Sequence, residues 1–114
     1  MINKTTLLVS TLKDADGNTH SNPKNVSGFQ EGVFFLEVTA KSGTAPTLDV
    51  DIETYDPETD DWYKLEAFTQ MTDIGKADPV KLANCLGQKI AISWVIGGTE
   101  TPTLTFSVSG IVKI

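Results

Sequence analysis

Apolar and polar side chains alternate along most of this chain. Between residues 47 and 55, for example, carboxylates separate Leu48, Val50 and Ile52. Successive side chains of a β-strand point to opposite faces of the sheet, so a period of two indicates a strand with one face against a core. It predicts an all-β fold in which the following side chains face the core: Phe34, Leu36, Val38, Ala40, Leu48, Val50, Ile52, Ile90, Ile92, Trp94, Ile96, Leu104, Phe106, Val108, Val112 and Ile114.

Clusters of Gly, Pro, Asn and Asp separate these runs at intervals typical of a sandwich. The predicted strands, seven or eight in number, are at 4–12, 26–29, 33–41, 47–55, 62–69, 79–83, 88–96 and 103–113. Only residues 78–86 could form a helical turn, and Pro79 followed by Val80 disfavours it. We therefore expect an antiparallel β-sandwich without substantial helix, with either a jelly-roll or an immunoglobulin-like topology.

A short pattern of Gly, Thr and Pro occurs twice. Residues 43–52 read GTAPTLDVDI, and residues 98–108 read GTETPTLTFSV, with one inserted residue. Each copy follows an apolar strand and opens another, which predicts two similar hairpins, since Pro just before a strand fixes φ without removing a ladder hydrogen bond. The copies are either a pseudo-repeat, with one hairpin in each sheet, or the turn chemistry that hairpins of one length share.

Length and charge limit the class of protein. A chain of 114 residues forms one domain, 1–114. The net charge is -6, and all nine basic residues are Lys. Without Arg the chain has no bidentate fork for phosphate or base edges, so we expect no nucleic-acid binding. No apolar run is long enough for a signal segment or a membrane span, so we expect a protein folded in a reducing compartment, away from membranes.

Seven carboxylates and no basic residue lie between residues 49 and 61. Asp49, Asp51 and Glu53 alternate with core residues and therefore point outward from one strand. The other four belong to a turn: Asp56, Glu58, Asp60 and Asp61. Carboxylates can serve a glycosidase or bind calcium, but a spacing of about 7 Å along the strand leaves each free to be solvated. We favour a solvated acidic edge, at which a basic partner, a neighbouring subunit or a cation would bind.

The other polar motifs are better explained as turns. Asp14–Asn18 places oxygens at alternate positions, but Gly17 is fourth rather than sixth in the register of a calcium loop. It predicts a tight turn within a mobile loop at 14–25. His20 lies in that polar loop, and Cys85 has no His near it and is expected to be small and partly buried. We therefore predict no catalytic residues, no cofactor, no metal site and no enzymatic activity.

Three aromatic residues flank the acidic turn: Tyr55, Trp62 and Tyr63. Aromatic faces beside carboxylates form a platform on which a sugar can stack. By the period of two, Tyr63 points inward with Leu65, and Trp62 points outward. An outward Trp beside carboxylates also suits a subunit interface. The predicted interface residues are Asp49, Asp51, Glu53, Asp60, Asp61 and Trp62.

The order of these signatures resembles a known group of proteins. Residues 42–52, the pairs Asp56-Pro57 and Trp62-Tyr63, and the run 90–99 leading into 102–108 are similar to small β-sandwich virion proteins of tailed bacteriophages. The resemblance covers roughly residues 32–110 and rests on turns and strands, not on a catalytic motif. It implies a non-enzymatic structural role, most simply capsid decoration or a head-associated accessory protein that stabilises the particle.

The resemblance also implies partners and a location. The partners would be the major capsid protein or other virion proteins, and the chain would be made in the host cytoplasm and reside in the virion. We expect a homo-oligomer, with a trimer suited to an icosahedral lattice, and an arm at 1–31 that reaches a neighbour. The alternatives are a neck or tail component and a carbohydrate-binding module that uses Trp62 and Tyr55.

Overall fold

The protein consists of β-strands joined by turns. The computed structural model describes residues 2–83 and 86–114, and within these ranges it contains no helix, so none that could cross a membrane. The strands are β1 (Ile2–Lys13), β2 (Gly17–Asn18), β3 (Lys24–Asn25), β4 (Glu31–Asp56), β5 (Asp61–Ala67), β6 (Gly75–Lys76), β7 (Val80–Leu82) and β8 (Lys89–Lys113). Every element is a strand and every pair of strands is antiparallel, which confirms the prediction of an antiparallel all-β fold.

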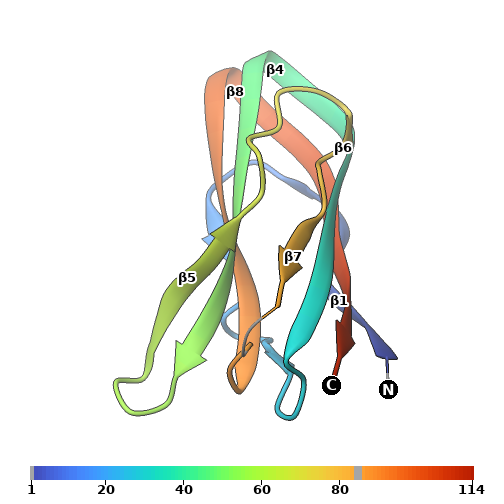
Figure 1. Ribbon diagram of the computed structural model, residues 1–114. Helices are drawn as coiled ribbons and strands as arrows, with labels where there is room; N and C mark the ends of the chain where they lie inside the picture. The colour runs from blue at the N-terminus through green and yellow to red at the C-terminus, as the bar shows by residue number, and fades with distance from the viewer. Residues whose placement is uncertain (1, 84–85) are drawn as a thin grey trace.

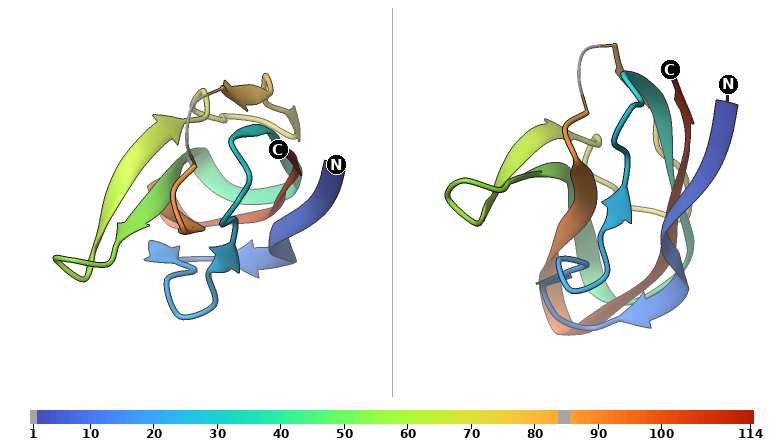
Figure 2. Two further views of the ribbon diagram at one scale, coloured as in Figure 1. Left: turned by 60° about the horizontal axis from the view of Figure 1, so that its bottom comes forward. Right: turned by 90° about the horizontal axis from the view of Figure 1, so that it is seen from below.

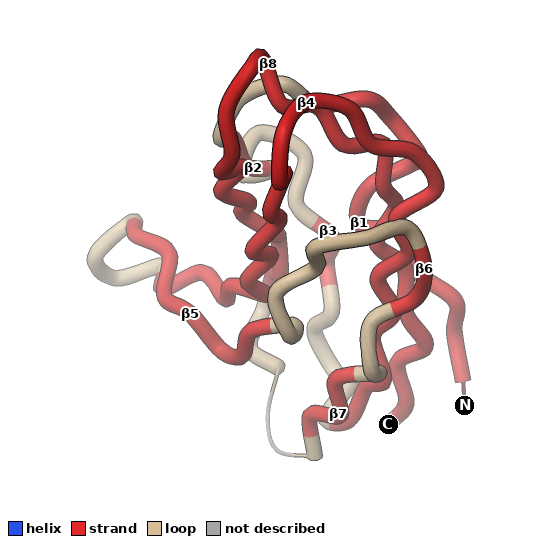
Figure 3. Tube along the Cα trace, turned by 90° about the horizontal axis from the view of Figure 1, so that it is seen from above, coloured by secondary structure: helices blue, strands red, loops and turns tan. Residues whose placement is uncertain are grey.

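Two very long strands, β4 and β8, form the frame of the molecule. They pair along almost their whole length, from Glu31 opposite Lys113 to Thr54 opposite Ile90. Midway the paired ribbon bends back on itself, so that each strand has two limbs (Figure 1). Figure 3 looks down on this bend, where β4 and β8 lie side by side.

The bend divides the strands into two layers. Layer 1 contains β1, residues 103–113 of β8, residues 31–42 of β4, and the short strands β6 and β7. Layer 2 contains β2, β3, residues 89–97 of β8, residues 47–56 of β4, and β5. Figure 2 shows from below how the limbs surround the interior, with β5 splayed away from the body. The predicted sandwich is therefore one folded ribbon with strands added at its edges.

The core lies between the layers and contains the residues that the period of two selected. Trp94 of layer 2 and Phe106 of layer 1 meet edge to face, with ring centroids 5.8 Å apart. Two predicted core residues are exposed. The register of β4 shifts between Val38 and Ala40, which turns Ala40 outward, and Ile114 follows the end of β8 and is 63% exposed.

The repeated Gly-Thr-Pro pattern forms the bend, and the prediction of two hairpins was wrong. Thr44 pairs with Thr99, so the two copies cross each other. Gly43 and Gly98 have φ values of 93° and 117°, in a region that side chains disfavour. A Cβ atom on Gly43 would lie 2.7 Å from Cα of Pro102, and one on Gly98 would lie 3.0 Å from Cα of Pro46. Each copy thus supplies the glycine that accommodates the other copy's proline.

The N-terminal part of the chain is built into the sheets. Within residues 1–31, set apart above as an arm, β1 pairs with β8, and Leu7 and Val26 are buried. The loop predicted at 14–25 contains β2 and β3, both paired with β8. The strand predicted at 26–29 is instead a turn, in which Phe29 donates a backbone hydrogen bond to Val26. Cys85 lies outside the described residues.

Candidate functional site

The outer face of layer 2 carries most of the side chains that the sequence singled out. Because Val50 and Ile52 face the core, Asp49, Asp51 and Glu53 point outward from β4. This limb of β4 lies between β8 and β5, so its carboxylates occupy the face of a central strand. The prediction of an acidic edge was therefore wrong in its location, since β5 forms the edge.

Each of the three carboxylates is half-buried and has a polar partner. The Gln70 amide donates a hydrogen bond of 2.9 Å to Asp49. The Lys64 ammonium lies 4.0 Å from Asp51. His20 Nε2 lies 2.6 Å from a carboxylate oxygen of Glu53, whose side chain is 16% exposed. The contact joins the segment before β3 to the outer face of β4.

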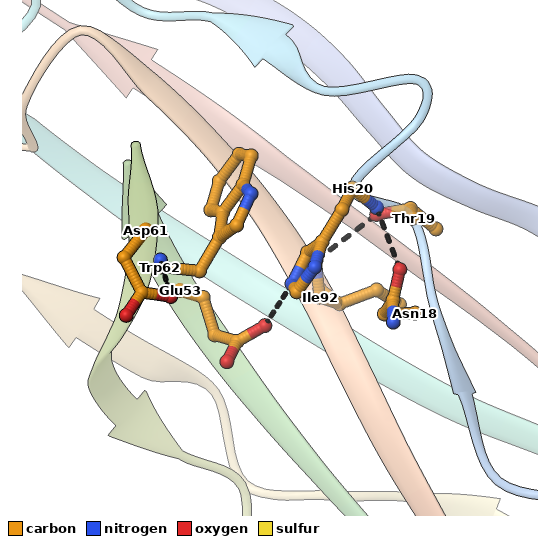
Figure 4. Close-up of polar contacts among 7 residues, drawn as sticks. All are labelled: Asn18, Thr19, His20, Glu53, Asp61, Trp62 and Ile92. Atoms are coloured by element: carbon orange, nitrogen blue, oxygen red, sulfur yellow. Dashed lines mark hydrogen bonds and ion pairs between the residues drawn. The ribbon is translucent and has the colours of Figure 1, made fainter. Parts of the chain in front are cut away.

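An aromatic cluster, defined here as His20, Tyr55 and Trp62, stands at the hairpin end of this face. The imidazole of His20 stacks on the Trp62 ring with centroids 4.6 Å apart and planes 5° from parallel (Figure 4). The Tyr55 ring is tilted against Trp62 at 5.3 Å, and the Lys89 ammonium lies 4.5 Å from the Tyr55 centroid. Cross-strand pairing of Tyr55 with Trp62 brings these two rings together.

Backbone contacts of β8 hold His20 in place. The Thr19 amide donates to the Ile92 carbonyl, and the Ile92 amide donates to the Thr19 hydroxyl at 3.0 Å. The Asn18 side chain accepts a hydrogen bond from the His20 amide. Beside this segment Ala91 points to the outer face, opposite Glu53, and is fully buried. The small side chain of Ala91 thus lies on the outer face but is shielded from solvent, next to Glu53 and the segment that holds His20.

The turn between β4 and β5 is organised by its own carboxylates. Asp56 accepts hydrogen bonds from the Glu58 amide and the Thr59 hydroxyl. The Tyr55 hydroxyl donates to Asp60. This hydrogen bond, with desolvation and the negative charges of Asp60 and Asp56, raises the pKa of Tyr55. These contacts fix the Tyr55 ring at one end of the aromatic cluster.

Tyr63 lies on the opposite side of the hairpin from Trp62. Its side chain is 52% exposed, so the prediction that it points into the core was wrong. Tyr63 pairs with Thr54 near the tip of the hairpin, which projects beyond the rest of the sandwich (Figure 1). Nearer the core the pairing shifts between Ile52 and Glu53, so the period of two does not continue along β5.

The segment Asp14–Asn18 is tied to β8 as a turn. An Asp16 carboxylate oxygen accepts a hydrogen bond of 2.8 Å from the Ile96 amide. The Ala15 carbonyl accepts one of 2.9 Å from the Trp94 indole. Both oxygens therefore accept hydrogen bonds from N–H groups of β8. Within residues 2–83 and 86–114, no group of three or more His, Cys, Asp or Glu side chains is placed to hold a metal ion.

Of the six predicted interface residues, Asp49, Asp51, Glu53 and Trp62 share one face, while Asp60 belongs to the adjoining turn and Asp61 begins β5. Sequence reasoning missed the role of His20, because its partners lie more than thirty positions away and no local pattern marks them. It also missed the outer face of layer 1. There Val33 and Phe35 alternate with the core residues of β4. These apolar residues at outward positions could have predicted a second apolar surface.

Comparison with known proteins shows the fold only. No family model and no curated protein matches the chain. Three solved structures of similar fold are the CBM22-1–GH10 modules of Clostridium thermocellum xylanase 10B complexed with xylohexaose, the CBM36-1 domain of a xylanase from the hindgut metagenome of Trinervitermes trinervoides, and the Yersinia pseudotuberculosis-derived mitogen.

Their TM-scores are 0.52, 0.50 and 0.50, at 12%, 9% and 9% identity. The matches cover 96%, 100% and 99% of this chain, and 28%, 98% and 86% of the three structures in the same order. The chain thus spans only 28% of the Clostridium xylanase chain. At these identities the likeness shows the β-sandwich architecture alone.

Proposed function

We propose that this protein is a non-catalytic carbohydrate-binding module whose binding surface is the β4–β5 hairpin. The observation that carries the proposal is the concentration of aromatic rings there. Tyr63 is 52% exposed on one side of the hairpin, and the stacked pair of His20 and Trp62 lies on the other. On the Trp62 side, the Asp60 carboxylate of the turn accepts a hydrogen bond from the Tyr55 hydroxyl, as it could from a sugar hydroxyl.

Sugar rings have an apolar face of C–H groups and a rim of hydroxyls, and the hairpin offers a partner for each. Tyr63 presents a rigid aromatic face at low conformational cost. Trp62 contributes less free surface, because His20 covers one face of its indole. We therefore infer that Tyr63 is the principal stacking residue and that Trp62 mainly supports the hairpin.

The solved structures of similar fold add support of a general kind. Two of the three belong to xylanases, and one of those is described as complexed with xylohexaose. A β-1,4-linked xylan oligosaccharide is therefore the first ligand to try, followed by an array of unrelated glycans.

The test is calorimetric titration of the protein with xylohexaose and with glycans selected from the array. Loss of one stacked ring is worth about 1 kcal/mol, so we expect Tyr63→Ala to weaken binding roughly fivefold. Phe35→Ala is the matched control, because Phe35 is an exposed aromatic on the other layer, and it should leave Kd unchanged. A folded wild-type protein that binds no glycan would refute the proposal.

The resemblance to virion proteins of tailed bacteriophages stays a prediction. Residues 42–52 and 102–108, which carry part of that resemblance, run from the bend of the β4–β8 ribbon into its limbs. These residues therefore determine the fold, which suits a carbohydrate-binding module and a virion protein alike. Virion partners, a trimer and a location on head, neck or tail stay predictions as well, and cryo-microscopy of a virion in which no density fits this chain would end that alternative.

A further inference from the structure

The outer face of layer 1 carries an apolar groove between lysines. Four residues lie directly opposite one another across four strands: Lys4, Ile111, Val33 and Lys81. With Phe35 and Leu82, the two central residues line a groove of about 450 Å³. Phe35 and Ile111 are each 39% exposed, so the groove presents apolar surface to solvent. Contiguous apolar surface with a polar rim is typical of an interaction site.

The outer face of layer 2 carries the complementary arrangement near the bend. Val95 is 54% exposed and projects from β8 directly opposite Asp49. On its other side Asp16 is bonded to the amide of the next residue, Ile96. An exposed apolar side chain thus stands between two carboxylates, whereas the groove on layer 1 is an apolar depression between two lysines.

Charge decides which two faces can meet. Lys81 and Lys113 line the groove together with one acid, Glu31, which lies 3.7 Å from Lys113. Lys4 adds a third lysine beside the groove, since it lies opposite Ile111 on the neighbouring strand. Packing groove against groove would bring lysines from both copies together. Packing the groove against the Val95 surface brings lysines to carboxylates, an arrangement that favours association and sets orientation.

We propose that a second copy of this chain docks its Val95 surface into the groove on layer 1. The interface is heterologous, since it joins two different surfaces, and it generates a ring if the rotation closes and a filament if it does not. A ring of three would match the predicted trimer. Val95 lies six residues along β8 from Lys89, about 20 Å at 3.3 Å per residue, so the Tyr55 end of the aromatic cluster lies away from this surface. His20 is nearer, because the preceding Thr19 is bonded to Ile92, three residues from Val95.

The test uses two variants that each block one surface. Ile111→Asp places a charge in the groove, and Val95→Asp places one on the projecting residue. Both positions are exposed, so the fold should persist, which circular dichroism checks. We expect the wild-type protein to self-associate in sedimentation up to millimolar concentration, and each variant alone to be monomeric or to associate roughly tenfold more weakly.

Mixing the two variants gives the decisive result. The Ile111→Asp copy keeps an intact Val95 surface and the Val95→Asp copy keeps an intact groove, so their mixture should form a 1:1 dimer and nothing larger. Ile74→Asp is the matched control, because Ile74 is 56% exposed and lies outside both surfaces. It should associate like the wild type.

Three results would overturn the proposal: a wild-type protein that is monomeric throughout, a Val95→Asp protein that associates normally, or a mixture of the blocked variants that stays monomeric. Salt gives an independent measurement. Because surface lysines and carboxylates are screened within about 8 Å at physiological ionic strength, added salt should weaken the association. Association that strengthens with salt would show an apolar contact without the charge pairing that selects these two faces.

Discussion

At the scale of single residues, Gly43 permits the crossing of the two long strands. Its φ is 93°, and an added Cβ would lie 2.7 Å from a backbone atom of Pro102. Gly28 has a similar φ of 87° but no atom within 4 Å of an added Cβ. We expect Gly43→Ala to lower the free energy of unfolding by about 2–4 kcal/mol and Gly28→Ala by about 1 kcal/mol. Urea denaturation measures both losses, and equal losses would contradict this account of the bend.

The Tyr55 hydroxyl links a single residue to the pH dependence of stability. Its hydrogen bond to Asp60, desolvation and nearby charges raise the pKa of Tyr55 above its ordinary value of about 10. A pKa raised by folding stabilises the protein below the unfolded pKa, and this contribution is lost as pH rises from about 10 through the folded pKa. We expect Asp60→Asn to return the pKa toward its ordinary value. Absorbance titration in a Tyr63→Phe background, where Tyr55 is the only tyrosine, checks this, and an unchanged pKa would refute it.

At the scale of elements, local periodicity located the limbs of the long strands and their core residues, but neither the short strands β2, β3 and β6 nor the pairing. The alternation in 47–55 and 103–113 identified core residues correctly, because burial on one face imposes it directly on the sequence. The repeated Gly-Thr-Pro pattern suits a hairpin as well as a bend, so only the partner strand distinguishes them. Tyr63 was predicted to face the core, but it lies near the tip of a hairpin that projects beyond the sandwich. The stacking of His20 on Trp62 joins distant segments, so no local pattern predicts it.

The segment between β1 and β3 offers a test of how one element is anchored. Asp16 accepts a hydrogen bond from the Ile96 amide, and Thr19 accepts one from the Ile92 amide. Each bond is worth about 1 kcal/mol. We therefore expect Asp16→Ala to speed amide hydrogen exchange at Ile96 roughly fivefold while Ile92 is unaffected, and Thr19→Val to do the reverse. Each variant is the other's control, and uniform acceleration at both amides would indicate global destabilisation instead.

At the scale of the whole molecule, folding the ribbon separates charges that the sequence intermixes. The seven carboxylates of residues 49–61 lie close together in the sequence, with no lysine between them. The lysines around the groove come from the distant positions 4, 81 and 113. Because β4 and β8 each contribute a limb to both layers, Asp49, Asp51 and Glu53 lie on layer 2, whereas Lys4, Lys81 and Lys113 lie on layer 1. A chain with a net charge of -6 therefore presents one acidic face and one face with an excess of lysines.

The same topology sets the speed of folding. Every partner of β8, including β1 and both limbs of β4, is distant in sequence, so loop closure must precede most of the pairing. We expect refolding on the scale of milliseconds to seconds, as for other β-sandwiches. Stopped-flow fluorescence of Trp62→Phe measures it, because Trp94 is then the only indole, is 6% exposed, and packs edge-on against Phe106 across the two layers. Its signal changes when the layers meet, and a refolding signal complete within microseconds would show that the layers form from local contacts.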